Sequence, residues 1–167
     1  TAFNEPIGDW DVWNVLDMVW MLNGATSFNQ RLGGKWATST ANKWGMFMGA
    51  AAFTGAGIGW WDVSSVTRMN CMLYGATAVS APIGGWDVSS VTDMQSMLCD
   101  ATAFNEPIGD WDVSSVTNMD FMLRGATSFN QRLGGQWATS TADKDHMFRD
   151  CPGSIEGKTN TATGTPH

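Results

Sequence analysis

Charged residues are scarce in this 167-residue chain, where Asp, Glu, Lys and Arg together make up 15% of the sequence. The nine Lys and Arg form no basic cluster and the net charge is −7, which argues against nucleic acid as a partner because that affinity comes from neutralising phosphates. No apolar run approaches the roughly 18 residues that a membrane span needs. The sequence shows no signal peptide and does not begin with Met, so we expect a processed or trimmed chain.

Cysteine and histidine are also few. Cys71, Cys99 and Cys151 are odd in number and lack a Cys-x-x-Cys pair or a neighbouring His, which argues against a disulfide framework and a zinc site. His146 and His167 build no Ser/His/Asp or Cys/His set. Residues 153–159 imitate a phosphate-binding loop but have three residues between the glycines where four are required. We therefore expect no enzyme, no catalytic residue and no cofactor.

The most prominent feature of the sequence is repetition. The run Asp-Val-Ser-Ser-Val-Thr occurs at 62–67, 87–92 and 112–117, and residues 1–50 closely match residues 102–151. Six of the ten Trp recur at intervals of 25 or 26 residues: Trp10, Trp36, Trp61, Trp86, Trp111 and Trp137. Such bias is typical of one local unit copied many times.

Within each unit the apolar spacing changes twice. The run 108–113 ends in a period of two, which predicts a short strand, and the run 116–126 has apolar residues at intervals of three and four, which predicts a short helix. We expect an α/β solenoid of six strand-helix coils with a parallel β ladder over residues 1–155. The six recurring Trp would form its internal column. The Thr-rich tail 156–167 is expected to be flexible, with plausible O-glycosylation sites.

The unit resembles a known repeat. The runs at 104–119 and 122–131 closely resemble the BspA-like surface-protein repeat of the leucine-rich-repeat group. The resemblance covers residues 1 to about 155. It implies a right-handed solenoid, an extracellular or cell-surface location, and an adhesive or scaffold role without catalytic residues.

Two sets of residues are candidates for binding. Asp62, Asp87 and Asp112 follow the Trp of three consecutive units, and either accept hydrogen bonds from the following Ser or attract calcium or a basic partner. Four further Trp lie off the core positions and mark either an interface or local packing against a neighbouring loop: Trp13, Trp20, Trp44 and Trp60.

The sequence thus favours a non-enzymatic, extracellular structural or adhesive scaffold that assembles end to end into filaments. Its partners would be itself, surface proteins or glycans. The alternative is a glycan- or protein-recognition module that uses the acidic strand face or the Trp patch.

Overall fold

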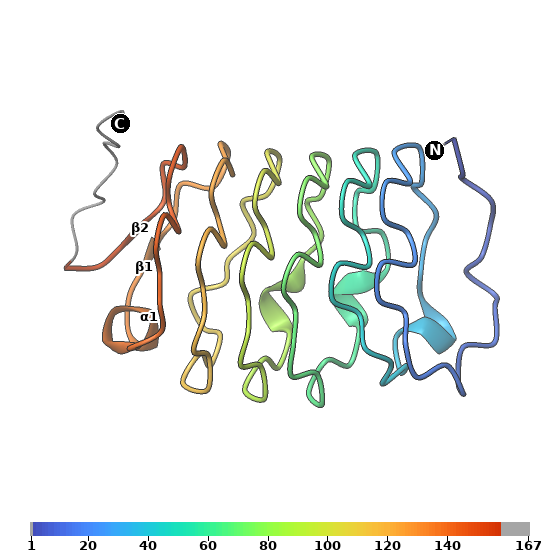
Figure 1. The fold of residues 1–167 in the computed structure, drawn as a ribbon, viewed down its shortest axis with the longest axis horizontal. Coiled ribbons are helices and arrows are strands. Elements are labelled where there is room, and N and C mark those ends of the chain that lie inside the picture. Colours follow the sequence, from blue (N-terminus) through green and yellow to red (C-terminus); the bar gives the residue numbers. More distant parts are fainter. Residues whose placement is uncertain (1, 158–167) are drawn as a thin grey trace.

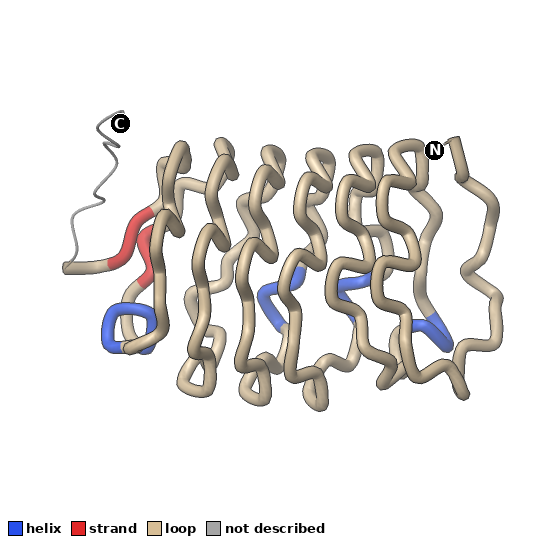
Figure 2. The backbone as a smooth tube through the Cα atoms, viewed as in Figure 1, coloured by secondary structure: helices blue, strands red, loops and turns tan. Residues whose placement is uncertain are grey.

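Turns and loops dominate the structure of the chain, a computed structural model that describes residues 2–157 (Figures 1 and 2). There are three 3-10 helices, η1 (Gly34–Trp36), η2 (Ile58–Trp60) and η3 (Ile83–Gly85). The only α-helix in the described part is α1 (Gln136–Thr139). The two strands, β1 (Arg132–Leu133) and β2 (Ser154–Ile155), pair in parallel near the C-terminal end.

The expected α/β solenoid, a right-handed stack of six strand-helix coils with a parallel β ladder, is wrong. Residues 2–157 contain one pair of two-residue strands and one four-residue α-helix, so neither a strand nor a helix recurs in each unit. The run 116–126, expected as a helix, forms turns. The run 108–113 contains a turn and no strand.

Positive φ angles explain why the helices do not form. Phe121 has φ 57°, and Trp20, Cys71, Ser96 and His146 take the same conformation in their own units. A non-glycine residue with positive φ is uncommon and cannot continue a right-handed helix. The helical spacing of the apolar residues therefore arises from a series of tight turns.

Neighbouring loops of chain lie side by side in Figure 1 and share backbone hydrogen bonds. Within 119–123, alternate N–H groups donate to carbonyls 24 residues further along, at 2.8–3.0 Å. These donor and acceptor pairs are Met119 and Asp143, Phe121 and Asp145, and Leu123 and Met147. The N–H groups between them close turns within their own loop, as Met122 does to Met119 at 3.1 Å. Other N–H groups donate back to the preceding loop, as Thr92 does to Thr67 at 2.8 Å. Apart from β1 and β2, the pairing between loops consists of isolated parallel bridges, so residues 2–157 contain no continuous ladder.

The apolar core runs through the inside of these loops. Five of the recurring Trp, from Trp36 to Trp137, are buried, and the indole N–H of each donates to a carbonyl of the preceding loop at 2.8–3.2 Å. The Trp111 ring stacks on Trp86 and Trp137 at centroid distances of 6.5 and 6.4 Å. Trp10 differs from the expectation, because it is 51% exposed at the N-terminal end of the row. Across residues 2–157, no helix is long and apolar enough to cross a membrane.

The shorter loop at 36–46 places a lysine in the core. Lys43 occupies the position that Met69 has in the next loop, and its side chain is buried. Its ammonium donates to the carbonyls of Ser39 and Ala41, and lies 5.5 Å from the centre of the Trp61 ring. The two carbonyls and the ring offset part of the desolvation of the charge.

Candidate functional site

The three repeated aspartates form local turns at the surface. The Asp62 and Asp87 carboxylates each accept the N–H of the Ser two residues on at 3.1 Å and its hydroxyl at 2.6 Å. Asp112 accepts the Ser114 N–H at 3.0 Å. These hydrogen bonds lower the pKa of all three carboxyls. Within residues 2–157, no group of three or more His, Cys, Asp or Glu side chains is placed to hold a metal ion.

A second row of Asx turns was missed by sequence reasoning. Asp17, Asn42, Asp93, Asn118 and Asp143 each accept the backbone N–H two residues on, at 2.8–3.4 Å. These residues recur in the sequence at intervals of about 25 residues, but they fall in segments that the sequence analysis predicts as helices. Arg68 takes this position in the third loop. Its guanidinium lies 3.7 Å from the Asp93 carboxylate and 5.6 Å from the Trp44 ring.

The cysteines offer no nucleophile. Cys71, Cys99 and Cys151 are free thiols. Burial raises the pKa of all three, and for Cys99, with help from the neighbouring Asp100 charge, to about 12. Because the thiolate is the reactive form, none of these thiols is activated at neutral pH.

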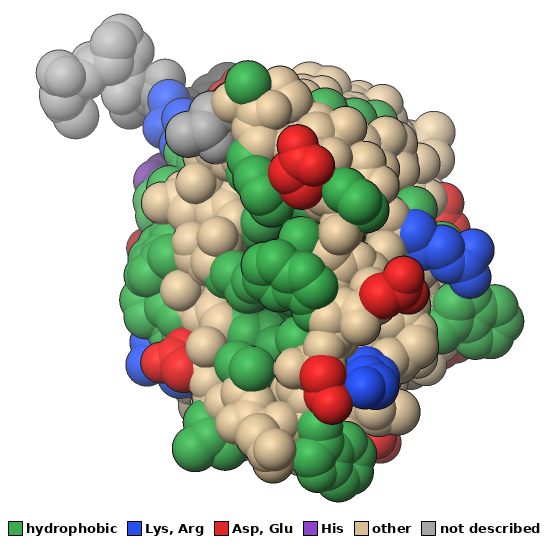
Figure 3. Space-filling model, turned by 90° about the vertical axis from the view of Figure 1, so that its right-hand side faces the viewer, with side chains coloured by type: hydrophobic (Ala, Val, Ile, Leu, Met, Phe, Trp, Pro, Cys, Tyr) green, Lys and Arg blue, Asp and Glu red, His purple; other side chains and the backbone are tan. Residues whose placement is uncertain are grey.

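Exposed large apolar side chains gather in one segment, residues 10–21. Trp13 is 72% and Leu16 is 83% exposed, and the other members of this group are Trp10, Val15, Trp20 and Met21. A hollow of about 240 Å³ at the same end is lined by Phe3, Ile7, Trp10, Met21, Leu22, Asn23 and Ala25. Figure 3 views the molecule from this end and shows apolar side chains in and around the hollow. We call these side chains and the hollow the N-terminal apolar face.

The four extra Trp do not form one patch. Trp13 and Trp20 belong to the N-terminal apolar face, and Trp44 packs edge-on against Trp20 at a centroid distance of 4.6 Å. Trp60 is 81% exposed in η2, two loops away. Trp44 therefore packs locally, whereas Trp13 is exposed and its role in an interface stays a prediction.

The N-terminal apolar face also carries backbone acceptors. The N–H groups of Trp20, Leu22 and Gly24 donate to the next loop at 2.7–3.4 Å. The carbonyls between them, those of Val19, Met21 and Asn23, accept no hydrogen bond from the described residues. Equivalent carbonyls in the next loop, at Trp44, Met46 and Met48, each accept one.

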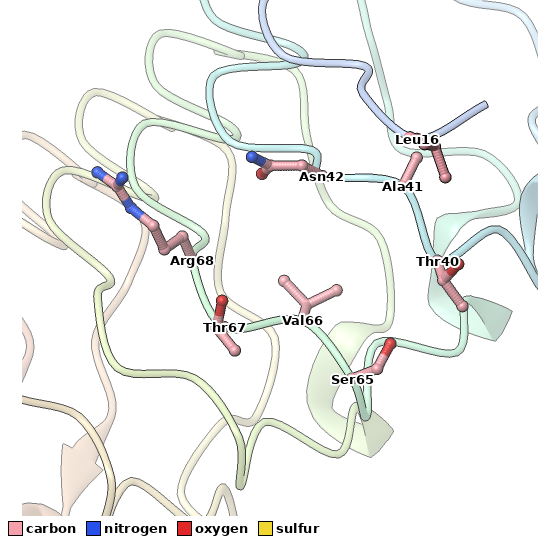
Figure 4. Close-up of a pocket in the computed structure, with 8 residues that line it drawn as sticks. All are labelled: Leu16, Thr40, Ala41, Asn42, Ser65, Val66, Thr67 and Arg68. Atoms are coloured by element: carbon pink, nitrogen blue, oxygen red, sulfur yellow. The ribbon is translucent and has the colours of Figure 1, made fainter.

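A groove of about 230 Å³ opens on the side of the molecule (Figure 4). Its walls come from Leu16, from residues 40–42 and from residues 65–68. Hydroxyl, amide and guanidinium groups line it, and no carboxylate does. The sequence alone did not predict this groove, although it shows that the unit beside the groove is one residue shorter than the next.

Comparison with known proteins gives a family and no function. No curated protein and no solved structure matches the chain significantly. A family model described as "Mycoplasma protein of unknown function, DUF285" matches residues 1–60 and again residues 44–160. This description lends no support to adhesion, filament formation or self-assembly, so these expectations are withdrawn. It also shows no link to BspA-like repeats, and the resemblance to them stays a prediction. Because the two matches together cover residues 1–160, the chain belongs to the DUF285 family.

Proposed function

We propose that the chain is a non-catalytic recognition module that binds a partner protein through its N-terminal apolar face. The observation that carries the proposal is the concentration of exposed large apolar side chains in residues 10–21, whereas Trp60 is their one counterpart elsewhere in the described part. An apolar cluster of this kind on a surface is typical of a protein interface. Trp is the residue type most enriched where interface energy concentrates.

The open carbonyls define the partner more closely. Val19, Met21 and Asn23 present acceptors at alternate residues beside the apolar hollow. A partner segment in extended conformation presents N–H donors at the same two-residue interval and places side chains on one side. We therefore propose an extended segment with one or two large apolar side chains as the bound element.

Two further observations support a module without chemistry of its own. Burial keeps the thiols protonated, and the described residues contain no metal-ligating cluster. The extracellular or cell-surface location stays a prediction of the sequence resemblance.

The test is a peptide-display selection on the whole chain, followed by affinity measurements on the selected peptides. The chain supplies its own matched variant, because Ser114 and Thr117 occupy the positions of Trp13 and Leu16 in the second copy of the unit. We expect selected peptides to carry aromatic or large aliphatic residues. The double variant Trp13→Ser, Leu16→Thr should weaken binding by at least about tenfold, since anchors of this kind contribute about 2 kcal/mol or more.

Trp60→Gly is the control, because it removes an exposed Trp that lies outside the N-terminal apolar face. It should leave the affinity unchanged. Peptides that bind the double variant as tightly as the wild type, or that lose affinity only with Trp60→Gly, would overturn the proposal.

A further inference from the structure

The groove in Figure 4 originates from a gap in the hydrogen bonding between neighbouring loops. Parallel bridges join Asp17 to Asn42, Arg68 to Asp93, and Asp93 onward through Asn118 to Asp143. The described residues show no bridge from Asn42 to Arg68. Loop 36–46 is one residue shorter than the loop that follows it, so no residue stands opposite Thr67. The groove occupies the place of that missing residue.

In other loops a backbone carbonyl occupies the equivalent position and accepts hydrogen bonds from the repeated Thr. The Thr92 N–H and hydroxyl both donate to the Thr67 carbonyl, at 2.8 and 3.1 Å. The Thr117 N–H and hydroxyl donate in the same way to the Thr92 carbonyl, at 2.9 and 3.0 Å. The repeated Thr is thus a fork of two donors that converge on a single oxygen atom.

At Thr67 the fork has no acceptor. Its N–H and hydroxyl donate to no atom of residues 2–157, and the nearby Ala41 carbonyl already accepts the Lys43 ammonium at 3.0 Å. In Figure 4 the Thr67, Val66 and Ser65 side chains point toward residues 40–42, into the groove. An oxygen atom of a ligand can take the position that a carbonyl holds in the following loops.

Charge selects the type of oxygen. Arg68 lines the groove beside Thr67, and in Figure 4 its guanidinium extends away from residues 40–42. Its one carboxylate partner among residues 2–157, Asp93, lies 3.7 Å away. A guanidinium carries five N–H donors, so this contact leaves donors for a ligand. Because charge-assisted hydrogen bonds are the stronger ones, an oxygen that carries negative charge fits the Thr67 fork and Arg68 together.

We propose that the groove binds a carboxylate, with one oxygen on the Thr67 N–H and hydroxyl. The exposed Arg68 side chain then turns its guanidinium toward the other oxygen. A volume of about 230 Å³ accommodates a small carboxylic acid or the last residue of a peptide. Leu16 and Val66 provide apolar contact for its carbon atoms. The site differs from the N-terminal apolar face, with which it shares only Leu16.

The experiment is a titration of the isotope-labelled chain followed by amide chemical shifts. Acetate, N-acetylglycine and glucuronate represent a free acid, a peptide C-terminus and an acidic sugar, and the tightest of the three identifies the source of the carboxylate. We expect saturable shifts at the Thr67 and Arg68 amides. N-Acetylglycinamide, the neutral analogue, should bind at least about tenfold more weakly, as should inorganic phosphate.

Variants distinguish binding to the Thr67 N–H and hydroxyl from a general effect of charge. Thr67→Val and Arg68→Gln should each weaken N-acetylglycine binding at least about fivefold. Thr92→Val removes the same hydroxyl from the next loop and should leave it unchanged. Asp93→Asn retains the turn and releases Arg68, so it should tighten binding. Melting curves of each variant establish that it is folded.

The proposal fails if no saturable shift occurs in folded protein, or if the amide or phosphate binds as well as the acid. It also fails if Thr92→Val weakens binding as much as Thr67→Val does.

Discussion

At the scale of single residues, the recurring Trp does two things that another aromatic residue would not do together. Its ring fills the core, and its indole N–H donates to a carbonyl of the preceding loop, for example from Trp61 to Leu32 at 2.8 Å. A buried backbone carbonyl needs such a donor because leaving it unpaired costs about 1–3 kcal/mol. Each Trp therefore links two loops. Trp10 is more exposed because no described loop lies beyond it.

The buried charge of Lys43 likewise provides hydrogen-bond donors for backbone carbonyls. Its ammonium donates to two carbonyls of the short loop, those of Ser39 and Ala41. Lys144 makes the same two contacts in the second short loop, to Ser140 and Ala142, but is only partly buried. In both short loops the lysine thus provides a donor for these two carbonyls.

We predict that Lys43→Met lowers the free energy of unfolding by about 2 kcal/mol, although Met is the residue at this position in other loops. Met restores apolar packing, but it leaves two carbonyls without their donor. Lys144→Met is the matched control and should cost less, because water reaches its carbonyls. Urea unfolding at pH 7 measures both. An unchanged or increased stability of Lys43→Met would contradict the donor role.

The pKa of Lys43 gives this prediction a second readout. Burial lowers the pKa to about 8 from its usual 10.5. Between these two values the unfolded chain binds the proton and the folded chain does not, so stability should rise with pH in this window. Lys43→Met should lose that rise, whereas Lys144→Met should retain it.

At the scale of elements, apolar spacing predicted which residues are buried better than which elements they form. Ile108, Val116 and Met119 are buried as a core pattern requires. The spacing could not distinguish a helix from successive turns, since both bring residues three or four apart to one side. The positive φ at Phe121 and the bonds to the next loop decide between them, and both depend on the neighbouring loop.

The sequence predicted only part of the candidate site, because the rest depends on contacts between neighbouring loops. Trp13 and Trp60 could be recognised as surplus to the core pattern, and both are exposed. Their distribution over two separate surfaces depends on how the loops lie beside each other. The Thr67 fork required knowledge that Thr92 donates backward to Thr67, which a residue count alone does not provide.

We predict that a Thr inserted between Ala41 and Asn42 closes the groove. The inserted carbonyl would accept the Thr67 N–H and hydroxyl, as Thr67 does for Thr92, and should add about 1 kcal/mol to the free energy of unfolding. N-Acetylglycine binding should disappear. The matched control is a Thr inserted between Ala142 and Asp143 in the second short loop, which lies away from the groove and should not affect that binding. Full binding in the first insertion variant would show that the gap is not the site.

At the scale of the whole molecule, a net charge of −7 raises the question of why three aspartates stand on consecutive loops. Asp62 and Asp112 both act to raise the pKa of Asp87, as repulsion requires. The hydrogen bonds from Ser89 act in the opposite direction, and the net pKa of Asp87 is lowered. The folded chain therefore favours the charged carboxylates, because the turns outweigh the repulsion between loops.

This balance predicts how stability depends on pH. A carboxyl whose pKa is lower in the folded chain stabilises it above the unfolded pKa of about 3.9, and this contribution is lost as pH falls through the folded value. The triple variant Asp62→Asn, Asp87→Asn, Asp112→Asn retains turn-forming side chains but removes the charges. It should be less stable than the wild type at pH 7, and the difference should shrink toward pH 2, where the wild-type carboxyls are protonated. Urea midpoints at both pH values measure this. A triple variant that is more stable at pH 7 would show that repulsion between the loops outweighs the hydrogen bonds from Ser.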